Sequence, residues 1–530
     1  MAPQKQIFIV LLIAALLAGC AGQPALTPTP SSVPDILLTF TPAPSLALSP
    51  AATPVLVLPD SSTPGALSPE PSATLSSINT GGPMIAYRAQ GGDTLEILGK
   101  RFGVDASEII SGDKLNLPAP GVLLEPGLLL LVPDRLPDAV SPGAQLIPDS
   151  EIVYSPSTIG FNVDDYVNAH GGYLSTYSEY LMSYGPTSGA QAVKQISLDN
   201  SLDARMMLAL IEYQSHWVLG QPTNLAQQDY PLGYVGNYSF YYKGLFRQLM
   251  WATAKLSEGY YQWRSGRLTE LTFSDGSKLR LNPRLNAGTA ALQYFFSLTQ
   301  DRAGWEQAVA ETGFAALYRQ MYGDPWERAK AVEPLIPAGL TQPALTLPFE
   351  RGQMWAFTHG PHTAWQEPDG IVITEGGALA ALDFAPAADT SGCILSNRWV
   401  VAPAGGVVVR TGIGVVMLDL DGDGHEQTGW DIFFMHIAAK DSVKLGDVLK
   451  AGDLIGHPSC EGGVSYGTHL HIARKYNGEW VLAAGPIPFD LDGWIAHGGE
   501  VAGQGTLVRD GQVVTANSNG PFETRITRDK

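Results

Sequence analysis

The spacing of apolar residues changes along the chain, and each change predicts a different kind of structure. Between residues 150 and 335 the apolar residues follow helical spacing, as in 206–211 and 290–296. This pattern predicts an α-helical middle domain. From residue 345 to 500, short β-rich runs such as 399–401 are separated by Gly, Pro and Asp. The second pattern predicts a C-terminal, all-β antiparallel domain.

Residues 1–20 have the pattern of an export signal. Lys5 precedes an apolar run at 7–17, and small residues lead to Cys20. The last four of these residues resemble the bacterial lipobox, which implies a lipid-modified Cys20. An ordinary cleaved signal peptide and an uncleaved anchor are the alternatives. No later apolar stretch approaches the roughly 20 residues of a membrane helix. We therefore expect an extracytoplasmic, cell-envelope protein attached to the membrane by its lipid alone.

Composition predicts a tether after this signal. Residues 21–82 are rich in Pro, Ser, Thr, Ala and Leu and contain no Lys or Arg, which favours an extended, disordered linker. The whole chain has a net charge of −19 and no dense basic patch, so nucleic acid is not an expected partner.

A small module is predicted at residues 83–135. It contains Tyr87, a Gly-Asp-Thr-Leu start at 92–95, a helical stretch at 97–102, and a closing segment at 126–133. Asp93 or Thr94 is placed to cap the first helix. These residues resemble a LysM module, which implies a βααβ fold and binding to N-acetylglucosamine-containing glycan. A small unrelated α/β domain is the alternative.

The middle domain has many aromatic residues, which pack in cores more often than they stack on sugars. Fragments 208–217 and 282–289 resemble lytic transglycosylases of the lysozyme superfamily. That family has a catalytic Glu where this chain has Gln214, and an amide cannot protonate a glycosidic oxygen. Glu212 lies two residues away, on the opposite side of a helix. We therefore interpret this domain as non-catalytic.

The strongest chemical motif is Gly-Thr-His-Leu-His at 467–471. In a strand, residues two apart point to the same face, so His469 and His471 would enter one groove. The motif and its flanks resemble the lysostaphin-like and beta-lytic zinc endopeptidases, also called LytM-type peptidases. Most of the chain's histidines lie in this same domain, which also favours a metal site.

This resemblance implies a set of zinc ligands. Asp383 matches the aspartate ligand and His471 the final histidine. The commonest pattern has a further histidine four residues before the aspartate, where this chain has Leu379. The beta-lytic branch has its histidine further upstream, which implies His362, with His359 as the rival. Three protein ligands leave a position open for water, as a catalytic zinc site requires.

The same resemblance places His436 and His469 beside the metal. One would take a proton from water and the other would stabilise the oxyanion of the intermediate. Which histidine has which role stays open.

Only three cysteines occur, so lipidation of Cys20 would leave Cys393 and Cys460 as the one intrachain pair. Outside the cytoplasm we expect them to form a disulfide, with free buried thiols as the alternative.

An acidic segment at 419–424 has alternating carboxylates like the start of a calcium loop. Trp430 occupies the position where an EF-hand has its bidentate Glu. An acidic hairpin turn between two strands is the simpler account.

These features predict a zinc-dependent cell-wall hydrolase that cleaves peptidoglycan peptides. One alternative is a non-catalytic lipoprotein of LysM and LytM type that activates separate amidases. Such proteins lack zinc ligands. Another is a surface protein that only binds glycan. The tail at 501–530 shows a turn at 509–511 and receives no function.

Overall fold

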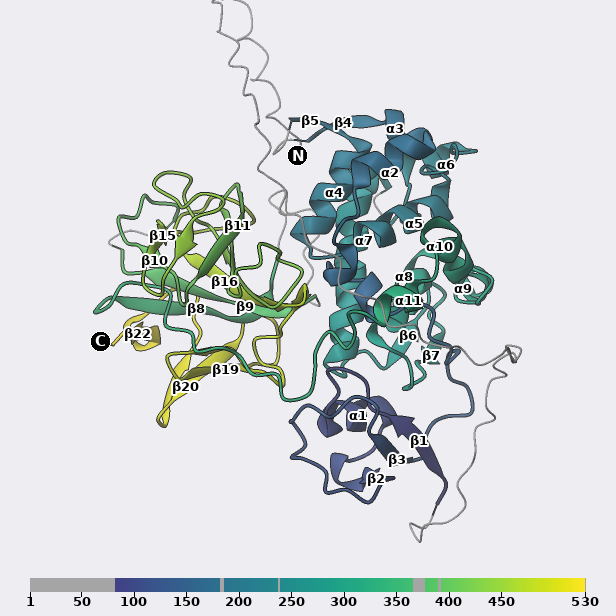
Figure 1. The fold of residues 1–530 in the computed structure, drawn as a ribbon, viewed down its shortest axis with the longest axis horizontal. Helices are drawn as coiled ribbons and strands as arrows, with labels where there is room; N and C mark the ends of the chain where they lie inside the picture. Colours follow the sequence, from purple (N-terminus) through teal and green to yellow (C-terminus); the bar gives the residue numbers. More distant parts are fainter. Residues whose placement is uncertain (1–81, 182–184, 237–238, 366–376, 389–391, 530) are drawn as a thin grey trace, which may run out of the picture. The chain divides into compact units, whose positions relative to one another are not determined.

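The computed structural model describes residues 82–529 except 182–184, 237–238, 366–376 and 389–391. All of them belong to the unit Ser72–Lys530. Figure 1 shows their helices and strands. The predicted signal peptide, Cys20 and almost all of the linker lie outside the described residues. Among the helices that are described, none combines the length and the apolar character needed to cross a membrane.

The N-terminal module is a three-stranded sheet with one α-helix. Its elements are β1 (Met84–Arg88), α1 (Leu95–Phe102), η1 (Ala106–Glu108), β2 (Ile110–Ser111) and β3 (Leu129–Pro133), and the strand order is β1-β3-β2. Thr94 caps α1 by accepting the Ile97 N–H. Asp93 is buried and instead binds the Tyr87 hydroxyl and Arg101.

The prediction of a second α-helix in this module is wrong. The chain makes a single 3₁₀ turn, η1, and is already paired with β3 at Ile110. Gly103 ends α1 in a left-handed conformation, and the segment after it closes only the bond from the Ile109 N–H to the Ala106 carbonyl, so the turn stays 3₁₀.

The middle region is helical. Its α-helices are α2 (Val163–His170), α3 (Tyr173–Thr176), α4 (Gly189–Asp199), α5 (Ala204–Ser215), α6 (Leu225–Asp229), α7 (Leu245–Arg264), α8 (Ala287–Thr299), α9 (Arg302–Ala308), α10 (Phe314–Tyr322) and α11 (Pro325–Ala329). The short turns η2 (Asp149–Glu151), η3 (Pro156–Thr158) and η4 (Ser239–Tyr242) and the hairpins β4 (Ser178–Leu181) with β5 (Gly185–Ser188) and β6 (Glu270–Thr272) with β7 (Lys278–Arg280) complete it.

Most aromatic residues of this region pack in its core. Trp217, Tyr260, Tyr261 and Trp263 are almost fully buried, whereas Tyr241 is exposed. Helices α7 and α8 approach closely at Gly259, where a Cβ would lie 3.0 Å from the Ala291 Cα. Burial of these rings therefore stabilises the helical packing and leaves them unavailable to a sugar.

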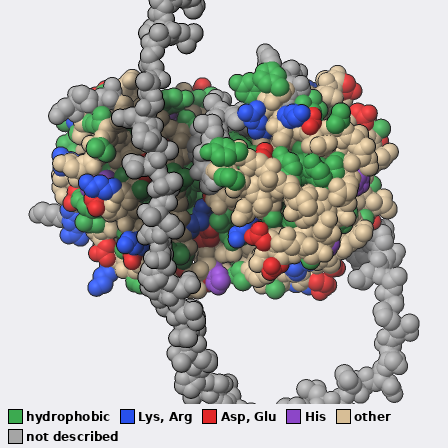
Figure 2. Space-filling view, turned by 90° about the horizontal axis from the view of Figure 1, so that it is seen from above, with side chains coloured by type: hydrophobic (Ala, Val, Ile, Leu, Met, Phe, Trp, Pro, Cys, Tyr) green, Lys and Arg blue, Asp and Glu red, His purple; other side chains and the backbone are tan. Residues whose placement is uncertain are grey.

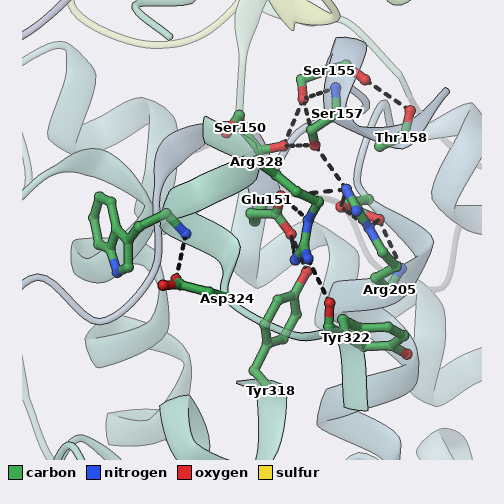
Figure 3. A network of polar contacts seen from close by, with 12 residues as sticks. Ser150, Glu151, Ser155, Ser157, Thr158, Arg205, Tyr318, Tyr322, Asp324 and Arg328 are labelled. Carbon is green, nitrogen blue, oxygen red and sulfur yellow. Dashed lines mark hydrogen bonds and ion pairs between the residues drawn. The ribbon is translucent and has the colours of Figure 1, made fainter. Parts of the chain in front are cut away.

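A buried acid ties several segments of the helical region together. Figure 3 shows Glu151 among Arg205, Tyr318 and Arg328. Its carboxylate accepts the Tyr318 hydroxyl at 2.6 Å and the Arg328 guanidinium at 2.7 Å, and it lies 3.6 Å from Arg205. The charge of Glu151 is thus compensated from three directions, as a fully buried carboxylate requires.

The C-terminal region is built on a nine-stranded sheet. Its order is β14-β11-β12-β13-β16-β9-β8-β22, and β17 pairs with β16. These strands are β8 (Met354–Thr363), β9 (Leu379–Pro386), β11 (Gly406–Gly412), β12 (Val415–Asp419), β13 (Trp430–Met435), β14 (Val448–Leu449), β16 (Leu470–Tyr476), β17 (Glu479–Trp480) and β22 (Arg525–Thr527). The expected antiparallel β region is therefore present.

Two smaller sheets flank it. One pairs β10 (Val400–Val401) with β15 (Leu454–Gly456), and the other contains β18 (Asp490–Leu491), β19 (Trp494–Gly498), β20 (Gly505–Arg509) and β21 (Gln512–Thr515). The predicted turn at 509–511 joins β20 to β21, and β22, preceded by the turn η5 (Phe522–Thr524), extends the main sheet beside β8. The tail is thus a structural part of the β region.

Each strand of the main sheet sends alternate side chains to opposite faces. Leu382, Phe384, Leu470 and Ile472 belong to one core cluster, whereas Ala381 and its neighbours on the other face pack with the helical region. Contacts between the two regions include ion pairs of Arg264 with Glu479 and of Arg410 with Asp199.

Acidic and basic side chains lie next to one another on the face that Figure 2 shows. No broad surface of one sign is visible on that face, which agrees with the lack of a basic patch in the sequence.

We expect the replacement Glu151→Gln to destabilise the helical region. It removes the carboxylate partner of Arg328, whereas Arg205 keeps Asp203, so the free energy of unfolding should fall by about 1–3 kcal/mol. Urea denaturation followed by tryptophan fluorescence measures this change. The matched replacement Glu327→Gln affects an exposed pair with Lys330 and should change stability by less than about 0.5 kcal/mol. Equal effects of the two replacements would contradict the assigned role of Glu151.

Candidate metal centre

Three side chains from three adjacent strands converge on one point. His362 Nε2 on β8 and His471 Nδ1 on β16 each lie 3.2 Å from Asp383 Oδ1 on β9, and 3.0 Å from each other. They are a group that could hold a metal ion. Tetrahedral zinc with bonds of about 2.0–2.1 Å separates its ligand atoms by about 3.3 Å. The three atoms therefore fit zinc.

The rest of each ligand is fixed by the backbone. The His362 Nδ1–H donates to the Gly360 carbonyl at 2.8 Å, and the His471 Nε2–H donates to the Ala364 carbonyl at 2.9 Å. Because a carbonyl can only accept, these bonds leave the other ring nitrogen unprotonated and directed at the metal position. Asp383 Oδ1 is buried and has no hydrogen-bond donor, which also suits a metal ligand.

Strand register explains how His362 reaches this position. Asp383 pairs directly with His471, so both side chains point to the same face. On the other side of β9, His362 pairs with Ala381, one side-chain repeat from Asp383. β9 has Leu379 where the commonest pattern has a histidine. β8 supplies the missing ligand through His362, which precedes the partner of Leu379, Thr363.

The irregular course of β8 depends on Gly360. The register of β8 against β9 shifts on both sides of His359 and again after His362. The Gly360 N–H donates to Gly503, and a Cβ at Gly360 would lie 2.6 Å from the Gln504 backbone. Only glycine permits this approach, which links the strand that carries His362 to the tail of the chain.

His359 lies at the edge of the group. Its Nδ1 is 3.6 Å from Asp383 Oδ2, and its side chain is 46% exposed. Of the two rival histidines, His362 is the one that the structure brings together with Asp383 and His471.

His436 and His469 lie beside the three ligands. Their ring centroids are 4.3 Å apart, and His469 Nε2 is 3.4 Å from Asp383 Oδ2. The His436 Nδ1–H donates to the Glu461 carbonyl, and the His469 Nδ1–H donates to the Gly467 carbonyl. Each ring therefore keeps Nε2 free to accept a proton.

The charges of the group depend on one another. Burial alone would raise the pKa of Asp383, but His362 and His469 hold it well below its usual value. Burial lowers the pKa of His471. Burial, followed by the nearby His469 and His471, lowers the pKa of His436 to about 3. His436 is therefore neutral at physiological pH.

These residues line an open cavity of about 1050 Å³. Its wall also contains Tyr466, which is 88% exposed, and two arginines, Arg398 and Arg525. No sequence pattern pointed to Arg525, because its place in the wall depends on the pairing of β22 with β8. The cavity is large enough for several residues of a peptide.

A disulfide between Cys393 and Cys460 fastens two segments of the cavity wall. Next to it, the Thr468 hydroxyl donates to the Ile394 carbonyl and accepts the Ile394 N–H. These links connect the loop after β9 to the residue before His469.

The residues of the transglycosylase-like fragments have structural partners. Glu212 is buried and accepts the N–H groups of Val218 and Leu219. Gln214 donates to Thr299 and accepts from Gln300. Neither side chain is arranged as an acid with a free proton to donate.

Residues 145–336 match the family model described as the LasA N-terminal domain. Among solved structures, the M23 metalloprotease pseudoalterin from the deep sea is 22% identical to this chain. The matched region covers 34% of this chain and 96% of the pseudoalterin chain, with a TM-score of 0.26. The catalytic domain of lysostaphin from Staphylococcus simulans is 25% identical and covers 24% of this chain and 87% of its own, with a TM-score of 0.17.

A zinc-containing peptidase from Vibrio cholerae is 19% identical and covers 28% of this chain and 41% of its own, with a TM-score of 0.19. No curated protein matches the chain. The chemical interpretation of the site therefore depends on its own geometry.

Zinc affinity should depend on pH. Burial alone would lower the pKa of His362, but Asp383 and the backbone carbonyls raise it above its ordinary value, which is about 6.5. Zinc needs the neutral ring of His362. The competing proton should therefore weaken zinc binding about tenfold for each pH unit below the raised pKa of His362. Competition with a chromophoric chelator between about pH 5 and 8 measures the affinity. An affinity that stays constant across this range would contradict His362 as a ligand.

Proposed function

We propose that this protein is a zinc-dependent endopeptidase that hydrolyses peptide bonds in peptidoglycan. One observation carries the proposal: three ligand atoms within 3.2 Å of one another lie on the wall of a cavity that the imidazoles of His436 and His469 also line. Among the described residues, three supply positions of a tetrahedral zinc and leave the fourth open, as in catalytic rather than structural sites.

Each residue of the site has a defined task. His362, Asp383 and His471 would hold the ion, with their orientation set by the backbone carbonyls of Gly360 and Ala364. Zinc bound there would supply a Lewis acid and a water that is nucleophilic near neutral pH.

His436 and His469 would handle the proton and the developing charge. Each Nδ1–H is engaged by a carbonyl, which leaves Nε2 of both rings unprotonated. Because the pKa of His436 is lowered to about 3, we assign proton transfer from water to His469. The ring that takes the proton then has an N–H that can donate to the oxyanion of the tetrahedral intermediate. His469 would thus take the proton, and His436 would stay neutral beside it.

The substrate assignment combines this site with the rest of the chain. The resemblance to wall peptidases favours peptidoglycan peptides as the substrate. The module at 83–135 would bind glycan and hold the enzyme on the wall. A lipid on Cys20 and the linker at 21–82 would keep the enzyme in the cell envelope, attached to the membrane.

The amidase-activator alternative is less favoured by the geometry. A degenerate domain would not need three ligand atoms at zinc spacing, with both histidine ligands fixed by backbone carbonyls. The purely glycan-binding alternative is less favoured for the same reason.

Zinc content and peptidoglycan cleavage by the full-length protein test the proposal. We expect one zinc per chain at this site and cleavage at peptide bonds, detected by mass spectrometry of the released fragments. The His362→Ala variant should lose most of the zinc and the activity. The His469→Ala variant should keep zinc and lose at least about a hundredfold in kcat.

Two controls make this test specific. His359→Ala should keep zinc, because His359 lies on the rim of the site. His497→Ala changes an exposed histidine outside the cavity wall and should keep both zinc and activity. A wild-type protein that binds zinc and cleaves no peptide bond in peptidoglycan would overturn the proposed activity.

The charge of the cavity predicts a further property of the substrate. Among the described residues of the wall, Asp383 is the only carboxylate, whereas Arg398 and Arg525 contribute two guanidinium groups. The stem peptides of peptidoglycan contain free carboxylates, which arginine binds well.

We therefore expect Arg525→Gln and Arg398→Gln each to raise KM for a carboxylate-bearing stem peptide about tenfold, with little change in kcat. An amidated peptide should lose this difference. Arg351→Gln, on an exposed turn, is the matched control. An unchanged KM in both cavity variants would contradict this role.

A further inference from the structure

The loop between β12 and β13 brings three carboxylates together. Asp419, Asp421 and Asp423 each offer one oxygen, and these oxygens lie within 4.8 Å of one another. They stand at alternate positions in the sequence and are followed by Gly424, with φ of 87°. Alternating carboxylates followed by a glycine in a sharp turn match the first half of a calcium loop.

Two of these carboxylates are turned into the loop. Asp419 is fully buried and accepts the backbone N–H groups of Asp421, Gly422 and Gly424 at 2.8–3.0 Å. The Asp421 carboxylate packs against Gly429, where a Cβ would lie 1.9 Å from Oδ2. Like charges that only needed solvation would point away from one another into water.

A fourth carboxylate faces the group from the sheet. Asp431 on β13 pairs directly with Asp419 on β12, so their side chains lie on the same face. Asp431 is fully buried, and neither of its oxygens has a hydrogen-bond partner. A buried carboxylate without a donor is costly unless a cation compensates it.

Burial holds the pKa of Asp431 well above its ordinary value, and the nearest lysine offsets this only in part. Lys475 pairs with Asp431 from the other side, on β16, but its Nζ forms its ion pair with Glu426 at 3.4 Å. Glu426 also binds Arg410, so this separate charge cluster is already satisfied. Asp431 is thus left beside Asp419 with neither a hydrogen-bond donor nor a direct ion pair of its own.

We propose that this loop is a calcium site, with Asp419, Asp421 and Asp423 as ligands and Asp431 as the carboxylate behind them. Calcium takes six to eight oxygen ligands in flexible geometry, so backbone carbonyls and water can complete the shell. An EF-hand has its last acidic ligand at the position of Trp430. Here the next residue in the sequence, Asp431, places a buried carboxylate beside Asp419 on the adjacent strand.

The site is separate from the candidate metal centre. Asp431 is at one end of β13, and His436 follows the other end, five residues along. At about 3.4 Å per residue, the two lie about 17 Å apart. Calcium should therefore bind whether or not His362, Asp383 and His471 hold an ion, and the proposal does not depend on peptidase activity.

Calcium titration of the full-length, zinc-loaded protein tests the proposal. Isothermal titration with CaCl₂ should give one site with Kd of about 10⁻⁴–10⁻³ M, because two of the ligands are exposed. The double variant Asp421→Asn, Asp423→Asn should lose this binding, and Asp431→Asn should weaken it about tenfold or more. Asp510→Asn, in the exposed turn after β20, is the matched control and should bind as the wild type does.

Thermal unfolding gives a second, independent readout. Calcium at about 10 mM should raise Tm of the wild type by several degrees and leave the double variant unchanged. Without calcium, the double variant should have the higher Tm, because two repelling charges are gone. The order of the two proteins therefore reverses on addition of calcium. Absence of binding at 10 mM calcium, or equal binding by the double variant, would overturn the proposal.

Discussion

The pairing of β9 with β16 is the constraint on which the metal centre depends. Asp383 and His471 are direct partners across these strands. Their neighbours Leu382, Phe384, Leu470 and Ile472 point to the opposite face and are buried in one apolar core. A slip of one residue would expose that core and turn a ligand away from the site. The hydrophobic effect therefore fixes the position of two polar ligands that contribute little to folding themselves.

The third ligand depends on a local departure from this regularity. β8 shifts register around His359 and His362, and Gly360 lets the segment before β20 approach the strand. The bulged strand can re-aim a side chain in a way that a regular strand cannot. This explains why a histidine missing from β9 can be replaced from the neighbouring strand without a change in the ligand triangle.

Local patterns in the sequence predicted the parts of the site that depend on short spacing. The two-residue separation of His469 and His471 indicated a common face, and the helical and β-rich patterns indicated the two kinds of fold. Thr94 as a helix cap also follows from local chemistry. The contribution of Arg525 and the packing of Gly360 against the tail could not be predicted, because they depend on contacts between segments more than 100 residues apart. The unpaired state of Asp431 likewise depends on strand register, which the sequence does not specify residue by residue.

The main sheet presents one face to two different environments. At the end that holds His362, Asp383 and His471, this face borders the open cavity. Further along, Met417, Phe433 and Ala473 on the same face are buried in the core shared with the helical region. The described residues that line the cavity all lie between Ala356 and Arg525, so the β region alone supplies this part of the wall. The same alternation of side chains thus assembles the ligands at one end of the face and packs the apolar core at the other.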